Sequence, residues 1–560
     1  MSKSKSSETR STFYVAIIII LILALVGMSY LYIQKPVANQ KEVLRTANSI
    51  LCHPSQFANC TDASLRYTNL ANLNLKGINL TRADLENSGL NGTDLSHANM
   101  HDANLRFTKM ISANLSNVYA HGADLWFSNL SHITITNSNF TDAILTATNL
   151  MNAKISKSNF AAALLYSANL NNSVINNSNF VAAAISFANL KNATISKSNF
   201  TGALLYSANF QHSTINNSKF AQGYLYLANL SNSAINNSNF IATTFTVANF
   251  QHSTINNSKF VNGYLYLANL SNSAINNSNF ASATLSAANL NNSAINNSNF
   301  TYATLSFANL KNTTISKSNF AAALLYSANL SNSAINNSNF TDATLSFANL
   351  KNTTISKSNF TYVTLSAAKL NNSAINNSDF TYAILAGAIL NNSAINNSDF
   401  VAATFTAAKL NNSAINNSDF TYASFITANL SNSAINNSDF AAATFFVANL
   451  KRVKILNSDL NTASFRDSNL TSIYVNDSNL RGADLSNANL YKAYIENSNL
   501  SYAIFYTTNL QNATLINVNL SHADLSYANL RNATLVGTSL NDSVLCNTIM
   551  PNGTVDNRGC

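Results

Sequence analysis

Apolar residues recur at every fifth position through most of the chain. Between residues 65 and 550, each fifth residue is Leu, Ile, Phe, Met or Val, with Ala120 as the exception. A second period of twenty overlies the first, because Phe recurs from Phe140 to Phe440 and Ile recurs from Ile135 to Ile455. Four five-residue steps for each identical residue indicate four steps per turn. The pattern therefore predicts a four-sided solenoid in which like residues stack on like.

A period of five excludes the two common elements in their regular form. Positions five apart on an α-helix point about 140° away from each other, and a continuous strand has a period of two. The pattern fits a short extended piece followed by a corner. In residues 83–87, we expect Ala83 and Leu85 to point inward, Asp84 to point outward, and Glu86 with Asn87 to form the turn. Successive turns then pair as parallel strands, which makes the expected fold all-β.

Individual five-residue units carry a family resemblance. Ala83-Asp84-Leu85, Ala103-Asn104-Leu105 and the double unit at residues 483–490 resemble the pentapeptide-repeat family, whose unit reads Ala-(Asp/Asn)-Leu-x-x. The central units place Ser and Phe where Ala and Leu are usual, as in Ser178-Asn179-Phe180, and keep the small-then-large pattern. The resemblance implies a right-handed quadrilateral parallel β-helix over residues 61–550. It implies no single function, because a shared fold carries many functions.

The chain begins with a short basic tail at residues 1–12, followed by an apolar run at residues 13–33. The run has 21 residues without a charge, which is long enough to span a bilayer. A cleaved signal peptide is the alternative, but no Ala-x-Ala site closes the run. We therefore expect an uncleaved transmembrane helix at residues 13–33, a linker and cap at residues 34–60, and a C-terminal tail at residues 551–560.

The four cysteines lie at the two ends of the repeats. Cys52 and Cys60 precede the first turn, whereas Cys546 falls in the last unit and Cys560 ends the chain. Two pairs that are close in sequence predict two local disulfides, with four unrelated thiols as the alternative. Disulfides form in oxidising compartments. The basic residues on the two sides of the apolar run do not set its orientation. The disulfides therefore decide the orientation, and they predict a single-pass membrane protein with extracytoplasmic repeats.

One side of the expected solenoid carries outward Tyr and Leu residues, with Phe187, Phe307 and Phe347 at the corner that follows. A contiguous apolar strip on a surface often marks a contact site; packing between neighbouring turns is the alternative. The candidate interaction strip consists of Leu164, Tyr166, Leu204, Tyr206, Tyr224, Tyr226, Tyr264, Tyr266, Leu324 and Tyr326.

Two other outward patterns are polar. Asn pairs such as Asn176-Asn177 and Asn296-Asn297 follow the stacked Ile residues. They predict hydrogen-bonded ladders; many also read as N-glycosylation sequons, which are too crowded for all to carry glycans. Five carboxylates recur at one outward position, where they could recruit cations or form a solvated face. They are Asp379, Asp399, Asp419, Asp439 and Asp459.

Motifs for catalysis are lacking in the sequence. The chain holds no phosphate loop, nucleophile elbow or His-Glu-x-x-His motif, and its eight His are scattered. We therefore expect no enzymatic activity, cofactor or metal site. The leading hypothesis is a membrane-anchored rod that presents a long surface to a protein partner or to a second copy of itself.

Composition bears on two alternatives. Some pentapeptide-repeat proteins modulate topoisomerases by imitating DNA, which requires an acidic surface. This chain has 31 Lys and Arg against 22 Asp and Glu, which disfavours mimicry. The basic residues form no stripe, so binding to nucleic acid is disfavoured as well. The regularly spaced rows of Asn residues would also allow binding to an ordered non-protein surface, such as ice or a glycan.

Overall fold

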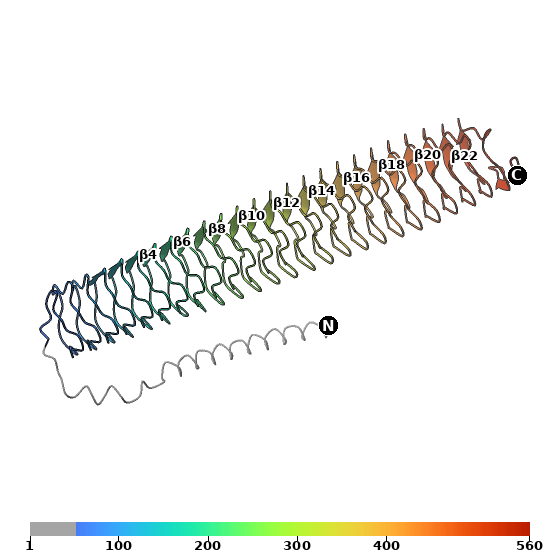
Figure 1. The fold of residues 1–560 in the computed structure, drawn as a ribbon. Coiled ribbons are helices and arrows are strands. Elements are labelled where there is room, and N and C mark those ends of the chain that lie inside the picture. The colour runs from blue at the N-terminus through green and yellow to red at the C-terminus, as the bar shows by residue number, and fades with distance from the viewer. Residues whose placement is uncertain (1–51) are drawn as a thin grey trace, which may run out of the picture.

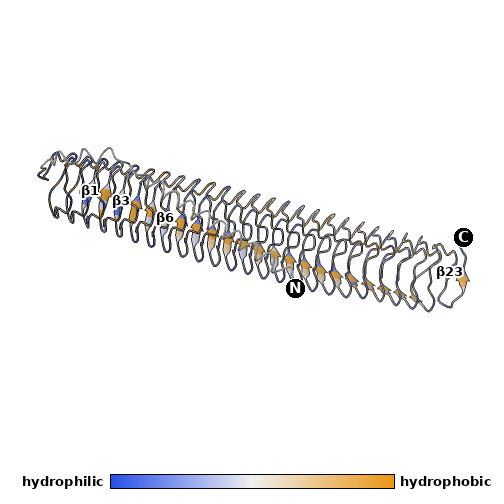
Figure 2. Cartoon of the chain, turned by 90° about the horizontal axis from the view of Figure 1, so that it is seen from below, coloured by the Kyte–Doolittle hydropathy of each residue, from blue (hydrophilic) through white to orange (hydrophobic). Residues whose placement is uncertain are grey.

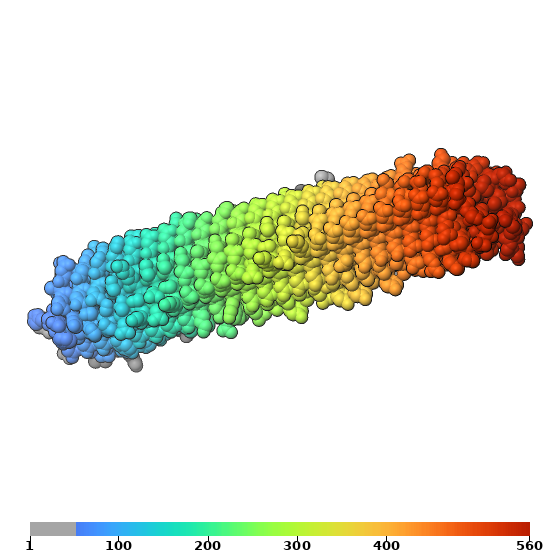
Figure 3. Space-filling model, turned by 90° about the horizontal axis from the view of Figure 1, so that it is seen from above, coloured from blue at the N-terminus to red at the C-terminus, as the bar shows by residue number. Residues whose placement is uncertain are grey.

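The chain forms a long straight rod of stacked turns (Figure 1). The structure is a computed structural model that describes residues 52–560. Parallel bridges join residues twenty apart on all sides of the rod, from Asn59 with Asn79 at one end to Asn529 with Ile549 at the other. The parallel solenoid with four five-residue steps per turn, expected from the sequence, is confirmed. In space-filling view, the colour changes steadily along the rod, as expected when each turn contacts only its neighbours (Figure 3).

The expected transmembrane helix at residues 13–33 lies outside the described residues. Between residues 52 and 560, the structure contains no helix with the length and apolar character needed to cross a membrane.

One side of every regular turn from residue 114 onward is a three-residue strand. The strands β1 to β22 form one sheet, in which each pairs in parallel with the next and partners lie twenty residues apart, as Ile275 does with Ile295. Figure 2 shows β1, β3 and β6 following one another along one side of the rod. The strands are β1 (Asn114–Ser116), β2 (Thr134–Thr136), β3 (Lys154–Ser156), β4 (Val174–Asn176), β5 (Thr194–Ser196), β6 (Thr214–Asn216), β7 (Ala234–Asn236), β8 (Thr254–Asn256), β9 (Ala274–Asn276), β10 (Ala294–Asn296), β11 (Thr314–Ser316), β12 (Ala334–Asn336), β13 (Thr354–Ser356), β14 (Ala374–Asn376), β15 (Ala394–Asn396), β16 (Ala414–Asn416), β17 (Ala434–Asn436), β18 (Lys454–Leu456), β19 (Tyr474–Asn476), β20 (Tyr494–Glu496), β21 (Thr514–Ile516), β22 (Thr534–Val536), β23 (Thr548–Ile549) and β24 (Val555–Asp556).

The corners between the sides are two residues long, and the second residue has a positive φ. The angle is 61° at Asn87 and 50° at Asn177. The turn expected at Glu86 and Asn87 is therefore confirmed. Asn adopts this left-handed conformation more readily than most residues, because its short polar side chain can hydrogen-bond locally. Backbone geometry thus accounts for many of the Asn residues that stand at corners.

The core contains the large residue at each fifth position and the small residue two positions before it. The Phe residues from Phe140 to Phe440 are buried. Neighbouring rings lie one turn apart, with centroids separated by 4.6–5.0 Å and planes within 18° of parallel. The continuous Phe column expected from the sequence is therefore confirmed.

A buried ladder of Ser hydroxyls runs beside the Phe column. The Oγ of Ser298 accepts a hydrogen bond from the backbone N–H of Ser278, one turn earlier, at 3.1 Å. It donates to the carbonyl of Asn296 at 2.8 Å. The small size of this position was expected from the sequence, and its polar role explains why Ser replaces the usual Ala. Each hydroxyl satisfies a backbone group that the corner leaves unpaired.

Both ends of the solenoid are closed by short-range links. The structure joins Cys52 to Cys60, with Cα atoms 5.3 Å apart, and Cys546 to Cys560, with Cα atoms 4.8 Å apart. Residues 551–560, expected as a tail, fold back so that β24 pairs antiparallel with β23. The last turns thus form a cap that interrupts the parallel stacking.

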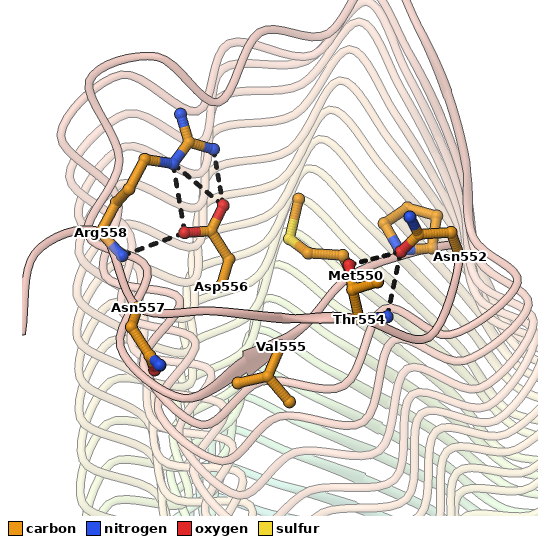
Figure 4. A pocket seen from close by; sticks show the side chains of 8 residues that line it. Met550, Asn552, Thr554, Val555, Asp556, Asn557 and Arg558 are labelled. Atoms are coloured by element: carbon orange, nitrogen blue, oxygen red, sulfur yellow. Dashed lines mark hydrogen bonds and ion pairs between the residues drawn. The ribbon is translucent and has the colours of Figure 1, made fainter.

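The cap contains an open hollow near the C-terminus that polar and apolar residues line in similar measure (Figure 4). There the Arg558 guanidinium donates to the Asp556 carboxylate at 2.7 Å. These hydrogen bonds lower the pKa of Asp556 below its ordinary value. On the other side of the hollow, the Thr554 backbone N–H donates to the side chain of Asn552 at 3.0 Å. The arrangement stabilises the final hairpin.

Candidate interaction surface

Each turn has four sides with different chemistry, which we name from the turn of residues 161–180. Residues 161–167 form the uncharged face, residues 168–172 the asparagine face, residues 173–177 the strand face, and residues 178–180 the aspartate face. The same names apply at every twentieth residue. Because the sides follow one another around the turn, the asparagine and aspartate faces flank the uncharged face, and the strand face lies opposite to it.

The uncharged face is the most distinctive surface of the rod. It extends over fifteen turns, from residues 161–167 to residues 441–447, and Asp342 is its single charged residue. At a spacing of about 4.8 Å per turn, this face is about 70 Å long. Every Lys between residues 161 and 450 lies on one of the other three faces.

The candidate strip lies on the uncharged face and divides into two parts. The exposed part has relative exposures of 40–54% and comprises Tyr224, Tyr264, Tyr266, Leu324 and Tyr326. The half-buried part comprises Leu164, Tyr166, Leu204 and Tyr206. Tyr226, expected to be exposed, is 8% exposed, and this expectation is wrong. It is not part of the hydrophobic core cluster, so neighbouring surface residues cover it.

Packing between neighbouring turns accounts for the half-buried part. The rings of Tyr206 and Tyr224 lie 6.1 Å apart. Burial, and then the neighbouring Tyr224 and Tyr166, raise the pKa of Tyr206, and burial raises the pKa of Tyr226. Here the alternative interpretation of the strip, packing between turns, describes the structure. The exposed part of the strip, from Tyr224 to Tyr326, is available to a partner.

The corners that border the uncharged face add exposed aromatic rings that the sequence analysis missed. Tyr302 and Tyr422 are each 67% exposed, and the rings of Tyr362 and Tyr382 stack at 5.1 Å. The sequence signal was the recurring Thr-Tyr pair that follows the buried Phe. These four Tyr have φ of 58–61°, a conformation that costs most residues about 1 kcal/mol or more. Exposed rings recover little of this cost by burial.

Phe rings occupy the opposite corner of the same face. Phe187, Phe307 and Phe347 also have positive φ and are 45–63% exposed. The uncharged face is therefore bordered by aromatic residues along both edges, a composition that is enriched at protein interfaces.

The asparagine face has a structural role. The Nδ2 of Asn269 donates to Oδ1 of Asn249, one turn earlier, at 3.2 Å. Its Oδ1 accepts from the backbone N–H of Ser271 and from Nδ2 of Asn289. The sequence predicted Asn ladders on the strand face, directly after the stacked Ile residues. One ladder exists on that face, where Nδ2 of Asn256 donates to Oδ1 of Asn236 at 2.8 Å. The ladder on the asparagine face was missed, although the Asn at every twentieth position from Asn129 to Asn349 indicates it.

The five Asp residues of the aspartate face form a continuous column, because each bridges to the next in parallel pairing. Burial, and then the charges of Asp379 and Asp419, raise the pKa of Asp399. Within residues 52–560, no Lys or Arg forms an ion pair with the column. In that same part of the chain, no group of His, Cys, Asp and Glu is suited to hold a metal ion.

Comparison with solved structures gives several partial likenesses. The chain is 29% identical to HetL, a pentapeptide repeat protein involved in heterocyst differentiation regulation in the cyanobacterium Nostoc sp. strain PCC 7120, over 41% of this chain and 91% of HetL, with a TM-score of 0.15. A pentapeptide repeat protein from the Arabidopsis thaliana thylakoid lumen is 25% identical over 18% of this chain and 66% of that protein, with a TM-score of 0.15. Full-length QnrB1, a plasmid-mediated fluoroquinolone resistance protein, is 17% identical over 34% of this chain and 84% of QnrB1, with a TM-score of 0.17. No curated protein matches the chain.

Comparison with protein families gives a match to "Pentapeptide repeats". The matched segments together cover more than half of the chain. They are residues 58–96, 78–117, 98–137, 121–156, 183–222, 303–342, 323–361, 338–377, 358–397, 463–501 and 503–542. With its five-residue steps and twenty-residue turns, this chain therefore belongs to the pentapeptide repeat family.

Proposed function

We propose that the protein is a non-enzymatic scaffold that self-associates through its uncharged face, and that residues 13–33 anchor it in a membrane with the repeats on the extracytoplasmic side. The observation that carries self-association is the run of fifteen turns with one charge, bordered by exposed aromatic rings. Charged residues are depleted at the core of protein interfaces and aromatic residues are enriched there.

The size of the uncharged face supports this proposal. A side with three extended residues is about 10 Å wide, and fifteen turns are about 70 Å long. Two such faces in contact bury about 1,400 Å², which falls within the range of about 1,200–2,000 Å² for stable protein interfaces. The face is also flat and repetitive, so small contacts add along its length.

Sedimentation tests self-association directly. Residues 52–560 contain all the turns that the structure describes and the disulfide at each end, so this segment can be compared in buffer with the full chain in detergent. We expect a dimer at micromolar concentration for both. A variant with Tyr264→Ser, Tyr266→Ser and Tyr326→Ser should dissociate, because these rings are exposed on the uncharged face.

A matched control is available on the opposite side of the rod. Tyr474 and Tyr494 stack at 5.3 Å on the strand face. Replacing both with Ser removes aromatic surface from the rod but leaves the uncharged face unchanged, so the dimer should persist. A wild-type chain that stays monomeric at tens of micromolar would contradict self-association.

Membrane attachment needs a separate test. We expect the full chain to resist carbonate extraction from membranes, and we expect protease added to intact cells to reach the repeats. Deletion of residues 13–33 should release the protein. Extraction of the full chain by carbonate, or repeats that protease reaches only after lysis, would contradict the proposed anchor or its orientation.

A further inference from the structure

We infer that two copies of the chain pack parallel and in register through their uncharged faces, around a two-fold axis that runs along the rods. This inference rests on the proposed function and specifies the arrangement of the partner. The first described turns of both copies then lie at the same end of the dimer.

The two possible two-fold arrangements bring different edges together. In each turn, the uncharged face begins at one corner, as at Tyr382, and ends at the next, as at Ala386 and Gly387. An axis along the rods sets the beginning edge of one copy against the ending edge of the other at the same height. An axis across the rods sets like edges together in antiparallel order. The sizes of the edge residues therefore discriminate between the arrangements.

Bulky and small residues alternate between the two edges of the same turn. Where the beginning edge carries Tyr382, the ending edge carries Ala386 and Gly387. Other turns show the reverse, with Tyr206 against Gly202, Tyr326 against Ala322 and Phe446 against Ala442. Two turns have large apolar residues on both edges: they hold Tyr302 with Phe307 and Tyr422 with Ile426. Parallel packing in register thus places the larger number of these rings opposite small residues. In three other turns the residue opposite is polar, because Asp342 faces Phe347, Gln222 faces Tyr226 and Asn262 faces Tyr266.

The fold itself does not require these small residues for space. A Cβ atom added at Gly202 or Gly387 would meet no heavy atom within 4 Å. Corners with the same positive φ elsewhere hold residues as large as Phe347. The open space beside Gly387 is therefore free to receive the ring of Tyr382 from the second copy.

Charges on the flanking faces favour the same arrangement. An axis along the rods sets the aspartate face of one copy beside the asparagine face of the other. Lys409 is an outward residue of the asparagine face and stands half a turn from both Asp399 and Asp419 in height. Lys369 has the same relation to Asp379. Within residues 52–560, neither Lys pairs with a carboxylate of its own chain.

A bulky substitution tests the edge contact. Ala386→Tyr introduces a side chain that the fold accepts at the equivalent positions of Tyr206 and Tyr326, but the new ring faces Tyr382 of the second copy. We expect about a tenfold weaker dimer or more. Ser286→Tyr is the matched control, because Ser282 stands opposite and the dimer should be unaffected. Adding Tyr382→Ala to Ala386→Tyr should restore dimerisation.

A charge exchange tests the flanks. Lys409→Asp in one sample, and Asp399→Lys with Asp419→Lys in another, should each weaken the dimer, because like charges then face each other across the interface. Mixing the two samples should restore a heterodimer, since each flank again has opposite charges. Loss of dimer without recovery on mixing would contradict the parallel pairing.

The orientation can be measured with one dye per chain. Asn192→Cys places a label on the exposed corner of the asparagine face, away from the interface. In the parallel dimer, donor and acceptor labels lie at the same height and transfer energy efficiently. In an antiparallel dimer centred on the uncharged face, they lie more than about 50 Å apart along the rod. A dimer without transfer overturns the inference alone, whereas a monomeric protein overturns the proposed function.

Discussion

The ring of Phe300 lies on the ring of Phe320, with centroids 4.8 Å apart and planes 1° from parallel. The same contact is repeated along the Phe column, so each ring is supported by one ring above and one below. We expect Phe300→Ala to destabilise the surrounding turns by about 3–5 kcal/mol, because it removes both contacts and leaves a cavity. Tyr302→Ala, two residues away on the surface, is the control and should cost far less.

Denaturant unfolding followed by hydrogen exchange measures this effect. Contacts run only between adjacent turns, so the loss should appear near residue 300 and could divide unfolding into two transitions. Equal loss of protection along the whole rod would contradict this nearest-neighbour description.

The Asn ladder provides a second prediction. Asn269 accepts hydrogen bonds from a backbone N–H and from Asn289, and donates one to Asn249. Asn269→Ala removes all three, and we expect a loss of about 1–3 kcal/mol at this turn. Thr304→Ala, at an outward position of the uncharged face, should have little effect. An unchanged unfolding midpoint for Asn269→Ala would show that water replaces the ladder.

The Asp column predicts a dependence of stability on pH. Burial and the neighbouring carboxylates raise the pKa of Asp399, so the folded state binds its proton more tightly than the unfolded state. Stability from this group is therefore present at acid pH and falls as the pH rises through the folded-state pKa. In the chain made monomeric by Tyr264→Ser, Tyr266→Ser and Tyr326→Ser, where no Lys409 of a second copy stands near the column, Asp399→Asn should raise the melting temperature at pH 7 and reduce its fall between about pH 4 and pH 7.

Asp467→Asn, outside the column, is the control for this measurement. It removes one negative charge without relieving the repulsion within the column. Equal effects of the two substitutions would contradict the role assigned to the neighbouring carboxylates.

The C-terminal cap provides a further prediction. Cys546→Ser opens the link to Cys560, which closes a loop with a sequence separation of 14. A loop of this size contributes roughly 3 kcal/mol in the chain-entropy model. We expect faster hydrogen exchange in β23 and β24 but no change in the turns near residue 300. Reduction of the wild-type chain should produce the same effect in β23 and β24, together with a second effect at the first turns, because it also opens the link between Cys52 and Cys60.

Much of the fold was predictable from the sequence because one short unit is repeated. The position of Leu85 fixes the direction of Ala83 and Asp84, and the repetition of the unit extends that result to every turn. The Phe column followed from the same register. The hydroxyl ladder was not predictable, because the sequence pattern requires only a small inward residue, and both Ala and Ser satisfy it. The role of the Ser298 hydroxyl depends on the backbone groups around it, which only the structure shows.

The candidate surface was predicted in part. Outward direction follows from the period, so the Tyr and Leu residues were placed on the correct side. Exposure depends on the neighbouring turns, and Tyr226 is covered by residues that no local pattern identifies. The four corner Tyr were missed because a position with positive φ is expected to hold Asn or Gly. Their conformation became evident only in the structure.

The twenty-residue register also limits how such a chain can change in length. An insertion of twenty residues adds one turn and leaves every later face in line, whereas an insertion of five moves all later residues to the next side. The two segments 211–240 and 251–280 are nearly identical and lie forty residues apart, a whole number of turns. Duplication in whole turns therefore lengthens the rod in fixed steps of one turn, and the uncharged face stays straight from one end to the other.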